Sequence, residues 1–516
     1  MRRRGGAEVE IPGGEEYIPP VKVFILGWIR GVFLLLLIPL VLAGCDDGPF
    51  ASQSLPGLDD DAELPPLSSL GIDDPGFIDG YQWYLETINA PLAWRVLRAL
   101  EELGPLSPTV VAVIDTTYEL EHEDMSDVFA AGGFDFINES STLLSPSDTS
   151  SDGHGSHVAG LIGARGGNGM GMVGLGYNIG LRRTVHILPL VMLDSTGEGD
   201  AEALRDSIFY ASGRANASGT VLVDPVSVIN MSLGSSGDGL GTYLQTAIDA
   251  AVAADIVIVA AAGNARNGDE PPGVLDFPAR MPEVIGVGSI DADRVRSPFS
   301  FFSARTEEDK IPDGALDLVA PGGVKFFEDG SLGILSTIPR DRYGALQGTS
   351  MAAPLVAGAA ALVRSANPYL TAPQVRQILR DTAVDLGEVG WDPEYGYGLI
   401  DVAAAVRRAR STSASVAPSA AAPVRTRVSP VHATWEVGGL STVLLSLDAE
   451  ELDRLGITDA PAHFSELTGV TFSESVPGFY LRGEVPVHLS GQDVLDRLNT
   501  ARGVRQAIQN RVIQFR

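Results

Sequence analysis

The run VVAVID, residues 110–115, is apolar up to its last position and ends in an acid. Further apolar runs follow it along the chain: HILPLVML (186–193), VSVINMSL (226–233), IVIVAAAG (256–263) and VIGVGSI (284–290). Helical patterns lie between them, for example at 202–212 and 243–254. Strands that are apolar throughout and alternate with helices are typical of a parallel sheet covered on both faces. The sequence therefore predicts an α/β domain with a mainly parallel sheet and helices on both faces.

Shifts in composition mark the ends of this domain, which we place at residues 76–410. Residues 45–75 are rich in Pro, Leu, Ser and Asp and show no periodicity, which is typical of a flexible tether. Residues 411–430 consist mainly of Ala, Ser, Pro and Arg and are predicted to form a linker. The rest of the chain, residues 431–516, is then a separate small unit.

This small unit has its own pattern of strands and helices. We expect strands at 441–447, at 478–482 and from residue 503 onward, and helices at 449–455 and 491–501. The order is close to βα followed by ββαβ, which predicts a small α+β domain. We interpret it as an independent interaction or spacer domain.

Charge and cysteine content exclude several classes of function. The 66 acidic residues outnumber the 36 basic ones, and the formal net charge is −30. A chain this acidic repels nucleic-acid phosphates, so we expect no nucleic-acid partner. Cys45 is the only cysteine, which excludes an intramolecular disulfide and a cysteine-based metal site.

The first 44 residues are typical of an export signal. Positive charges accompany the apolar run GVFLLLLIPLVLAG at 31–44, which is shorter than the about 20 residues of a transmembrane helix. This run leads into LAGC at 42–45, which resembles the lipobox of bacterial lipoproteins. We therefore expect a signal peptide at 1–44, lipidation of Cys45, and an exported lipoprotein anchored to a cell-envelope membrane, periplasmic or on the outer face. The alternative is an uncleaved signal anchor in which the cysteine has no role.

Three segments supply an acid, a histidine and a serine in positions that suit nucleophilic catalysis. Asp115 ends an apolar strand, His154 begins a helix in DGHGSHVAG, and Ser350 begins another in GTSMAAP. Strand ends and helix starts in an open α/β sheet face one crevice. A serine hydroxyl becomes nucleophilic when a histidine takes its proton, and an acid fixes the tautomer of that histidine. We therefore predict Asp115, His154 and Ser350 as a catalytic triad.

Attack on a carbonyl also creates an oxyanion, which needs hydrogen-bond donors already in place. Asn264 follows the apolar run at 256–263 and offers a side-chain amide. The backbone N–H of Ser350, at the start of a helix, is the second predicted donor. We predict that these two groups form an oxyanion hole.

These residues and their neighbours resemble the subtilisin-like serine protease family over residues 82–406. The landmarks are INAPLAW (88–94), INMSLG (229–234), LVAPG (318–322) and GYGLID (396–401), together with the three segments above. The resemblance implies a serine endopeptidase that hydrolyses peptide bonds of proteins or peptides through an acyl-enzyme intermediate, with no cofactor for catalysis. It also implies that substrate pairs as an extended strand with Ser232, Leu233 and Gly234.

The resemblance further implies one structural calcium site. The matching residues here are Asp74, Asp124 and Asn168, whose carboxylate and amide oxygens are of the kind that calcium prefers. The alternative interpretation is that all three are solvated loop residues.

Two positions depart from the family pattern. Thr117 stands where the family usually has glycine, so we expect an altered turn after the catalytic acid, because β-branched residues avoid positive φ. Leu355 stands where many relatives have histidine. Of the remaining histidines, His157 is interpreted as a packed structural residue one helical turn beyond the catalytic one, and His122 as a solvated loop residue among acidic neighbours.

Two other functions fit the same residues. The fold can persist as a lipid-anchored binding module without turnover, and the same triad can serve an esterase or a transferase. The tail at 431–516 also resembles, loosely, the ferredoxin-like prodomain of the family. Its alternative role is therefore to dock on the catalytic domain as a folding aid or an inhibitor.

Overall fold

The computed structural model describes residues 64–413, except for 144–152, 178–183, 238, 266–272, 305–310 and 325–332. Beyond residue 413 it describes 442–447, 460–468, 470–476, 480–484, 494, 497–498, 504–509 and 512–515. The predicted signal peptide, Cys45 and the first part of the predicted tether lie outside the described residues.

The last part of the predicted tether is packed. Arg95 donates from Nε to the carbonyl oxygen of Pro65 at 2.6 Å, and η1 (Leu67–Leu70) is a 3₁₀ helix. Apolar side chains in this segment pack against the core: Leu64, Leu67, Leu70 and Ile72. Three-residue spacing places Leu67 and Leu70 on one face of this 3₁₀ helix, which explains their shared contact with the core. The prediction of a flexible tether is therefore wrong for residues 64–75.

A seven-stranded sheet forms the centre of the large domain predicted at residues 76–410. Its order is β2-β3-β1-β5-β7-β8-β9, and all its pairings are parallel. The strands are β1 (Thr109–Asp115), β2 (Phe134–Asp135), β3 (Val185–Val191), β5 (Val228–Met231), β7 (Val257–Ala261), β8 (Ile285–Ile290) and β9 (Leu316–Pro321). The apolar runs of the sequence are these buried strands, so the predicted mainly parallel sheet is confirmed.

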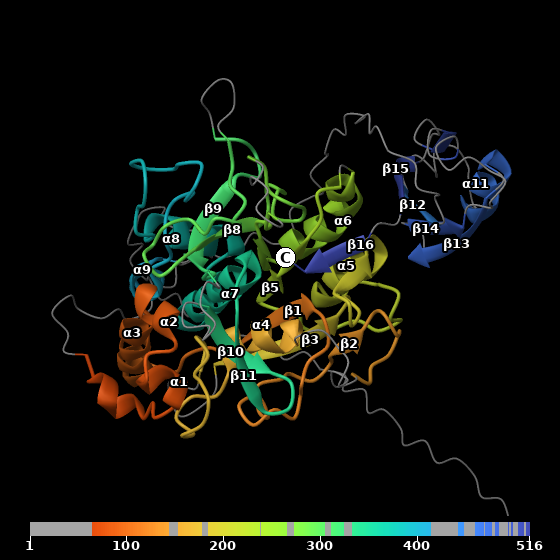
Figure 1. The fold of residues 1–516 in the computed structure, drawn as a ribbon. Helices are drawn as coiled ribbons and strands as arrows, with labels where there is room; N and C mark the ends of the chain where they lie inside the picture. Colours follow the sequence, from red (N-terminus) through yellow and green to blue (C-terminus); the bar gives the residue numbers. More distant parts are fainter. Residues whose placement is uncertain are drawn as a thin grey trace, which may run out of the picture. The chain divides into compact units, whose positions relative to one another are not determined.

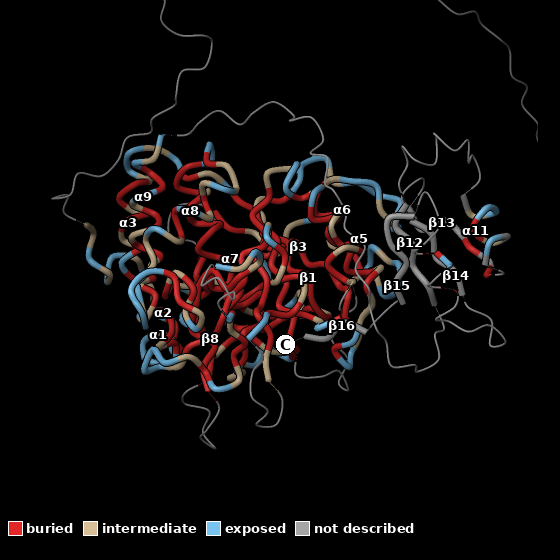
Figure 2. Tube along the Cα trace, turned by 90° about the horizontal axis from the view of Figure 1, so that it is seen from above, coloured by how far each residue is buried: buried red, intermediate tan, exposed pale blue. Residues whose placement is uncertain are grey.

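Helices cover both faces of this sheet, with α4 and α7 on one side and α5 and α6 on the other (Figures 1 and 2). Their bounds are α4 (His154–Gly163), α5 (Ala201–Ala211), α6 (Leu240–Ala253) and α7 (Thr349–Ala366). The many Ala residues of α7 let its backbone approach the strands closely. Its length and composition would also suit a membrane span, yet 94% of it is buried in the core.

The remaining helices of this domain belong to the segments before β1 and after α7 (Figure 1). They are α1 (Pro75–Ile78), α2 (Trp83–Thr87), α3 (Ala90–Leu103), α8 (Ala372–Asp381) and α9 (Val402–Ser411). At the start of α8, Thr371 and Gln374 form a reciprocal capping box, which satisfies two backbone N–H groups. α3 and α9 pack against each other, so helices from the two ends of the domain are joined.

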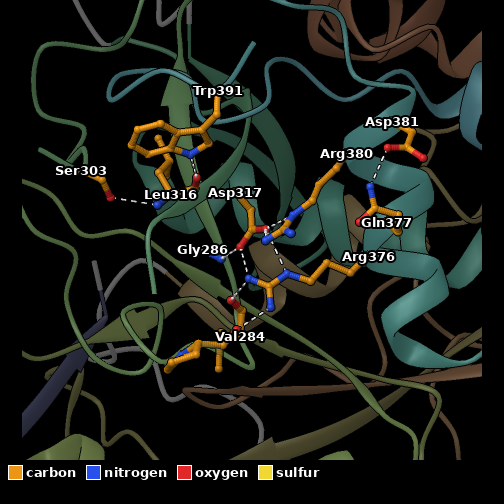
Figure 3. Close-up of polar contacts among 11 residues, drawn as sticks. Val284, Gly286, Ser303, Leu316, Asp317, Arg376, Gln377, Arg380, Asp381 and Trp391 are labelled. Atoms are coloured by element: carbon orange, nitrogen blue, oxygen red, sulfur yellow. Dashed lines mark hydrogen bonds and ion pairs between the residues drawn. The ribbon is translucent and has the colours of Figure 1, made fainter. Parts of the chain in front are cut away.

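A buried ion cluster ties α8 to β9 (Figure 3). Asp317 in β9 is fully buried. Arg376 donates to both of its carboxylate oxygens, at 3.0 and 2.6 Å, and Arg380 donates from Nε at 2.6 Å. The backbone N–H of Gly286 in β8 also donates to this carboxylate at 3.3 Å. Two permanent cations therefore neutralise an acid in the interior of the sheet.

Beyond residue 413 the described residues contain a second sheet, in the order β13-β14-β12-β15, with antiparallel pairings. Its elements are β12 (Thr442–Leu447), α11 (Ala460–Thr468), β13 (Thr471–Val476), β14 (Tyr480–Glu484) and β15 (Val504–Gln509). The strands expected at 441–447, 478–482 and after 503 are present. The expected helix at 449–455 lies outside the described residues, and that at 491–501 lies largely outside them.

The last described strand does not join this second sheet. β16 (Val512–Phe515) lies between β4 (Glu198–Asp200) and β6 (Leu233–Gly234), and both pairings are antiparallel. Nothing in the sequence predicted this pairing.

The large domain also contains a β-hairpin, which consists of β10 (Ile334–Ile338) and β11 (Arg342–Leu346).

Candidate active site

Asp115 is the last residue of β1 and is fully buried. The backbone N–H of Thr116 donates to its Oδ1 at 2.7 Å. The apolar run before Asp115 is paired on both sides, by β3 and by β5, so the position of the carboxylate is fixed by the centre of the sheet. The structure therefore presents a buried carboxylate at the carboxyl end of a central strand.

His154 begins α4, and its Nδ1 lies 2.7 Å from Asp115 Oδ1. Gly153 precedes it with φ of 67°, and a Cβ there would lie 2.0 Å from Cδ of Pro339, so this helix start requires glycine. The backbone N–H of Gly155 donates to Thr116 Oγ1 at 2.9 Å, which ties the helix start to the strand end. The histidine is thereby oriented by backbone contacts as well as by the acid.

Ser350 lies in the first turn of α7 and is buried. Its Oγ donates to the carbonyl oxygen of Ser232 at 3.1 Å, and Ser232 Oγ donates back to the carbonyl oxygen of Ser350 at 2.8 Å. α7 packs against α4, which carries His154 at its own start. The serine is thus held between the histidine helix and the segment predicted to bind substrate.

Asn264 follows β7 and lies beside the start of α7. Its Oδ1 accepts from the backbone N–H of Thr349 at 3.0 Å and from Thr349 Oγ1 at 3.1 Å. These two bonds fix the amide so that Nδ2 is the group directed away from Thr349. The arrangement suits a donor for an oxyanion formed next to Ser350.

The turn after Asp115 accommodates Thr117 without positive φ at that residue. Among the described residues, non-glycine positions with positive φ include Asn89 and Asp255 but not Thr117. Thr116 stabilises the turn through its backbone N–H to Asp115 and its hydroxyl to α4. Thr117 is therefore not strained, because its φ does not lie in the left-handed region that β-branched residues avoid.

The two remaining histidines near the site have different surroundings from each other. His157 is fully buried, and its Nε2 lies 2.9 Å from the carbonyl oxygen of Ile334. Burial, followed by the nearby His154, lowers the pKa of His157 to about 3. A neutral imidazole in this position is structural, as predicted.

His122 is also fully buried, so its interpretation as a solvated residue is wrong. Its Nε2 lies 3.0 Å from the carbonyl oxygen of Arg342, and its Nδ1 accepts from the backbone N–H of Asp124 at 3.2 Å. The ring also meets the edge of Tyr343. The acidic neighbours in sequence suggested exposure, but the β10–β11 hairpin covers this loop.

The three residues predicted to bind calcium come together. Asn168 Nδ2 donates to Asp124 Oδ1 at 2.7 Å, and the backbone N–H of Gly167 donates to Asp74 Oδ2 at 2.7 Å. Both carboxylates are fully buried, and burial raises the pKa of each; the charge of Asp124 raises that of Asp74 further. The solvated-loop alternative is therefore wrong.

Two adjacent buried carboxylates suit a cation in charge and in ligand type. Among the described residues, however, no group of three or more acidic, histidine or cysteine side chains is placed so that it could hold a metal ion. Asn168 presents its N–H to Asp124, while its Oδ1 accepts from Met170 N at 3.1 Å. The pair therefore fits a cation, provided that the amide turns to present its oxygen and that backbone carbonyls complete the ligand set.

Sequence reasoning missed β4. This strand is the second wall of the groove beside Ser350, by which we mean the slot between the facing edges of β4 and β6. β6 contains two of the predicted substrate-binding residues, and β4 faces it across the position of one strand. A Cβ at Gly199 in β4 would lie 2.1 Å from the carbonyl oxygen of Met192, so only glycine allows this close approach. A glycine flanked by acids just after a buried strand was the available signal.

Comparison with known proteins agrees with this geometry. A model of the subtilase family of peptidases matches residues 107–398. Subtilisin DY of Bacillus licheniformis is 36% identical over 297 residues, which are 58% of this chain and 90% of the relative. Subtilisin E of Bacillus subtilis is 38% identical over 329 residues, which are 63% of this chain and 72% of the relative.

Solved structures give the same result. One described as proteases from Pseudoalteromonas arctica matches with a TM-score of 0.54 and 30% sequence identity, and the match covers 66% of this chain and 99% of that one. The family model spans more than half of the chain, and it includes Asp115, His154 and Ser350. This chain belongs to the subtilase family and is a subtilisin-like serine endopeptidase that acts on proteins or peptides.

Proposed function

We propose that the chain is an exported, membrane-tethered endopeptidase in which Ser350 is the nucleophile, His154 its base and Asp115 the acid that orients the base. The main support is the 2.7 Å contact between His154 Nδ1 and Asp115 Oδ1. It commits Nδ1 to the acid and assigns proton transfer to Nε2. Asn264 Nδ2 and the backbone N–H of Ser350 are the proposed oxyanion donors.

In this mechanism the Ser350 hydroxyl turns from the Ser232 carbonyl toward His154. Oγ attacks the peptide carbonyl carbon while its proton passes to Nε2, and the carbonyl oxygen becomes an anion held by the two donors. The intermediate collapses, the C–N bond breaks, and His154 gives the proton to the leaving amine. Water then attacks the acyl-enzyme with His154 again as base, which releases the acid product and restores the serine.

The substrate is proposed to lie as an extended strand along Ser232, Leu233 and Gly234, with β4 on its other side. Backbone hydrogen bonds to both edges would give affinity with little dependence on side chains. A fluorophosphonate probe tests the nucleophile, and we expect it to label the wild type but not Ser350→Ala. Absence of labelling on folded wild type would favour the binding module, whereas ester turnover that greatly exceeds casein turnover would favour the esterase or transferase.

The membrane attachment is proposed to be a lipid on Cys45. The support is the sequence LAGC at 42–45, which places the only cysteine directly after a short apolar run. We expect the wild type to enter the detergent phase on Triton X-114 partitioning, and Cys45→Ser to enter the aqueous phase or to remain unprocessed. Detergent-phase partitioning of a fully processed Cys45→Ser chain would overturn the proposal, and Cys45→Ala is a second variant with the same expected result.

We also propose that Asp74 and Asp124 hold one structural calcium ion, together with Asn168 once its amide oxygen faces inward. The ion would offset two buried negative charges and would join the segment before α1 to the loops at 124 and 168. It has no part in the reaction. The test of this site is given with the other predictions below.

A further inference from the structure

The groove beside Ser350 contains a strand from the chain itself. In β16, Ile513 pairs with Gly199 of β4, and Gln514 pairs with both Glu198 of β4 and Gly234 of β6. The three strands form a sheet in the order β4-β16-β6, distinct from the central sheet. β16 therefore uses the inner edges of both walls.

The register of β16 against β6 brings the chain toward Ser350, the proposed nucleophile. Phe515 pairs with Leu233, and the residue before Leu233 is Ser232, whose carbonyl oxygen accepts the Ser350 hydroxyl at 3.1 Å. In an antiparallel pair, successive residues of one strand face successively earlier residues of the other. The direction of β16 along β6 is therefore the direction that ends at Ser350.

A peptide that presents a carbonyl to Ser350 has to use the same backbone groups. β4 and β6 are short strands whose facing edges offer N–H and C=O groups to one added strand. Strands pair at a spacing of about 4.8 Å, so a slot between two edges admits one strand at a time. Occupation by β16 and occupation by substrate are therefore mutually exclusive.

The sequence of the segment also suits this slot. Residues 509–516, QNRVIQFR, contain two arginines and no acid, whereas β4 contributes Glu198 and Asp200. The segment thus carries a positive charge in a chain whose net charge is −30. A segment attached to the same chain also has a high effective concentration, on the order of millimolar, without any association step.

We infer that β16 is a built-in competitive inhibitor that occupies the substrate groove, so that peptide cleavage requires its release. The inference rests on the proposed role of the groove at Ser232–Gly234. Competition within one chain raises the apparent KM and leaves kcat unchanged, because the inhibitor is absent from every productive complex. The inhibition does not depend on protein concentration.

A proline in the middle of β16 tests this in the full chain. Gln514→Pro removes the one N–H of the residue that pairs with both walls, and Gln514→Ala keeps that N–H while it removes the same side chain. We expect Gln514→Pro to lower KM for a tetrapeptide anilide at least about tenfold with kcat unchanged, since a lost strand pairing is worth roughly that factor. Gln514→Ala should behave as wild type.

A binding measurement separates this inference from the proposed catalysis. In the Ser350→Ala background, a fluorescein-labelled substrate peptide should bind about tenfold more tightly when Gln514→Pro is added and not when Gln514→Ala is added. The peptide RVIQFR, residues 511–516, should compete with it in the Pro variant, and a scrambled peptide should not. This result stands even if the wild type shows no turnover, in which case only the proposed function fails.

Equal KM values for wild type and both Gln514 variants, or equal peptide affinity in the Ser350→Ala background, would overturn the inference. Unchanged circular dichroism and an unchanged unfolding midpoint show that Gln514→Pro is folded. A change in kcat without a change in KM would also contradict it, because competition for the groove acts on KM.

Discussion

Asp115 and Asp317 are both fully buried aspartates on strands of the central sheet, but their partners differ. Asp115 meets the imidazole of His154 and a backbone N–H through one oxygen, and its Oδ2 is buried with no hydrogen-bond partner in the part of the chain that the structure describes. Asp317 meets two guanidinium groups, with contacts to both oxygens (Figure 3).

The partner determines what each acid can do. A guanidinium stays charged at any working pH, so the charge pair around Asp317 is permanent and holds α8 against β9. An imidazole gains and loses a proton near neutrality, so the charge pair around Asp115 can form during a reaction and disappear afterwards. One end of the sheet therefore uses a buried acid for stability, and the other is arranged for proton transfer.

The largest expected effect tests whether the partner of Asp115 acts on Ser350. We expect Ser350→Ala and His154→Ala each to lower kcat by about 10⁶, the magnitude established for this pair in subtilisin. The double variant should lose little more, because both residues serve one proton transfer. Casein hydrolysis by the purified chain measures kcat of these variants. Additive losses would show that His154 and Ser350 do not share one proton transfer.

Substitution of the two acids tests the comparison directly. Asp115→Asn should lower kcat by about 10⁴, as the same change does in another serine protease, and should change the denaturation midpoint little. Asp317→Asn should lower the free energy of unfolding by about 3 kcal/mol, because two arginines lose their carboxylate, and should leave kcat of the folded protein unchanged. Urea denaturation and casein kinetics on both variants measure these effects. A large loss of stability in Asp115→Asn together with a large loss of kcat in Asp317→Asn would refute the roles given to the two acids.

Asn264 tests a second part of the proposed mechanism, because this residue is proposed to stabilise charge without moving a proton. Asn264→Ala should lower kcat by about 10²–10³ with KM nearly unchanged. Thr349→Val is the matched control: it keeps the backbone N–H bond to Asn264 Oδ1 and removes the hydroxyl bond to that oxygen, together with the bond that the hydroxyl accepts from the backbone N–H of Gly263 at 3.2 Å, so it should cost about tenfold or less. An effect of Asn264→Ala on KM alone would remove this residue from the oxyanion hole.

Asp74 extends the comparison to a buried acid whose proposed counter-charge comes from solution. Burial raises its pKa above the ordinary value of 3.8, so in chelator the folded state loses stability as pH rises through the raised pKa. Added calcium should restore about 2.7 kcal/mol at a hundredfold excess over its Kd. Asp74→Asn keeps an oxygen acceptor but removes the charge, so it should abolish the calcium response and flatten the pH dependence in chelator.

Thermal unfolding of wild type and Asp74→Asn, with calcium and with chelator, between pH 4 and 8 measures this smallest effect. Asp79→Asn, at the end of α1 and away from the carboxylate pair, is a control that should respond to calcium as the wild type does. A calcium response that persists in Asp74→Asn would remove this residue from the ligand set.

The sequence by itself determined the central domain. Runs such as 110–114 and 256–263 are apolar along their whole length, and that local pattern is enough to predict a parallel sheet. The contact between Asp115 and His154 was also predictable, because one residue ends a strand and the other begins a helix, where side chains of an open α/β sheet meet.

Tertiary structure decided what local patterns do not contain. The burial of His122 depends on a hairpin more than 200 residues away in sequence, and the packing of residues 64–75 depends on a core they do not help to define. The position of β16 is the clearest case. Its few residues have no distinctive period, and a short strand pairs with whichever free edges the fold places near it. Only the assembled groove, with β4 and β6 facing each other, determines that this strand lies there.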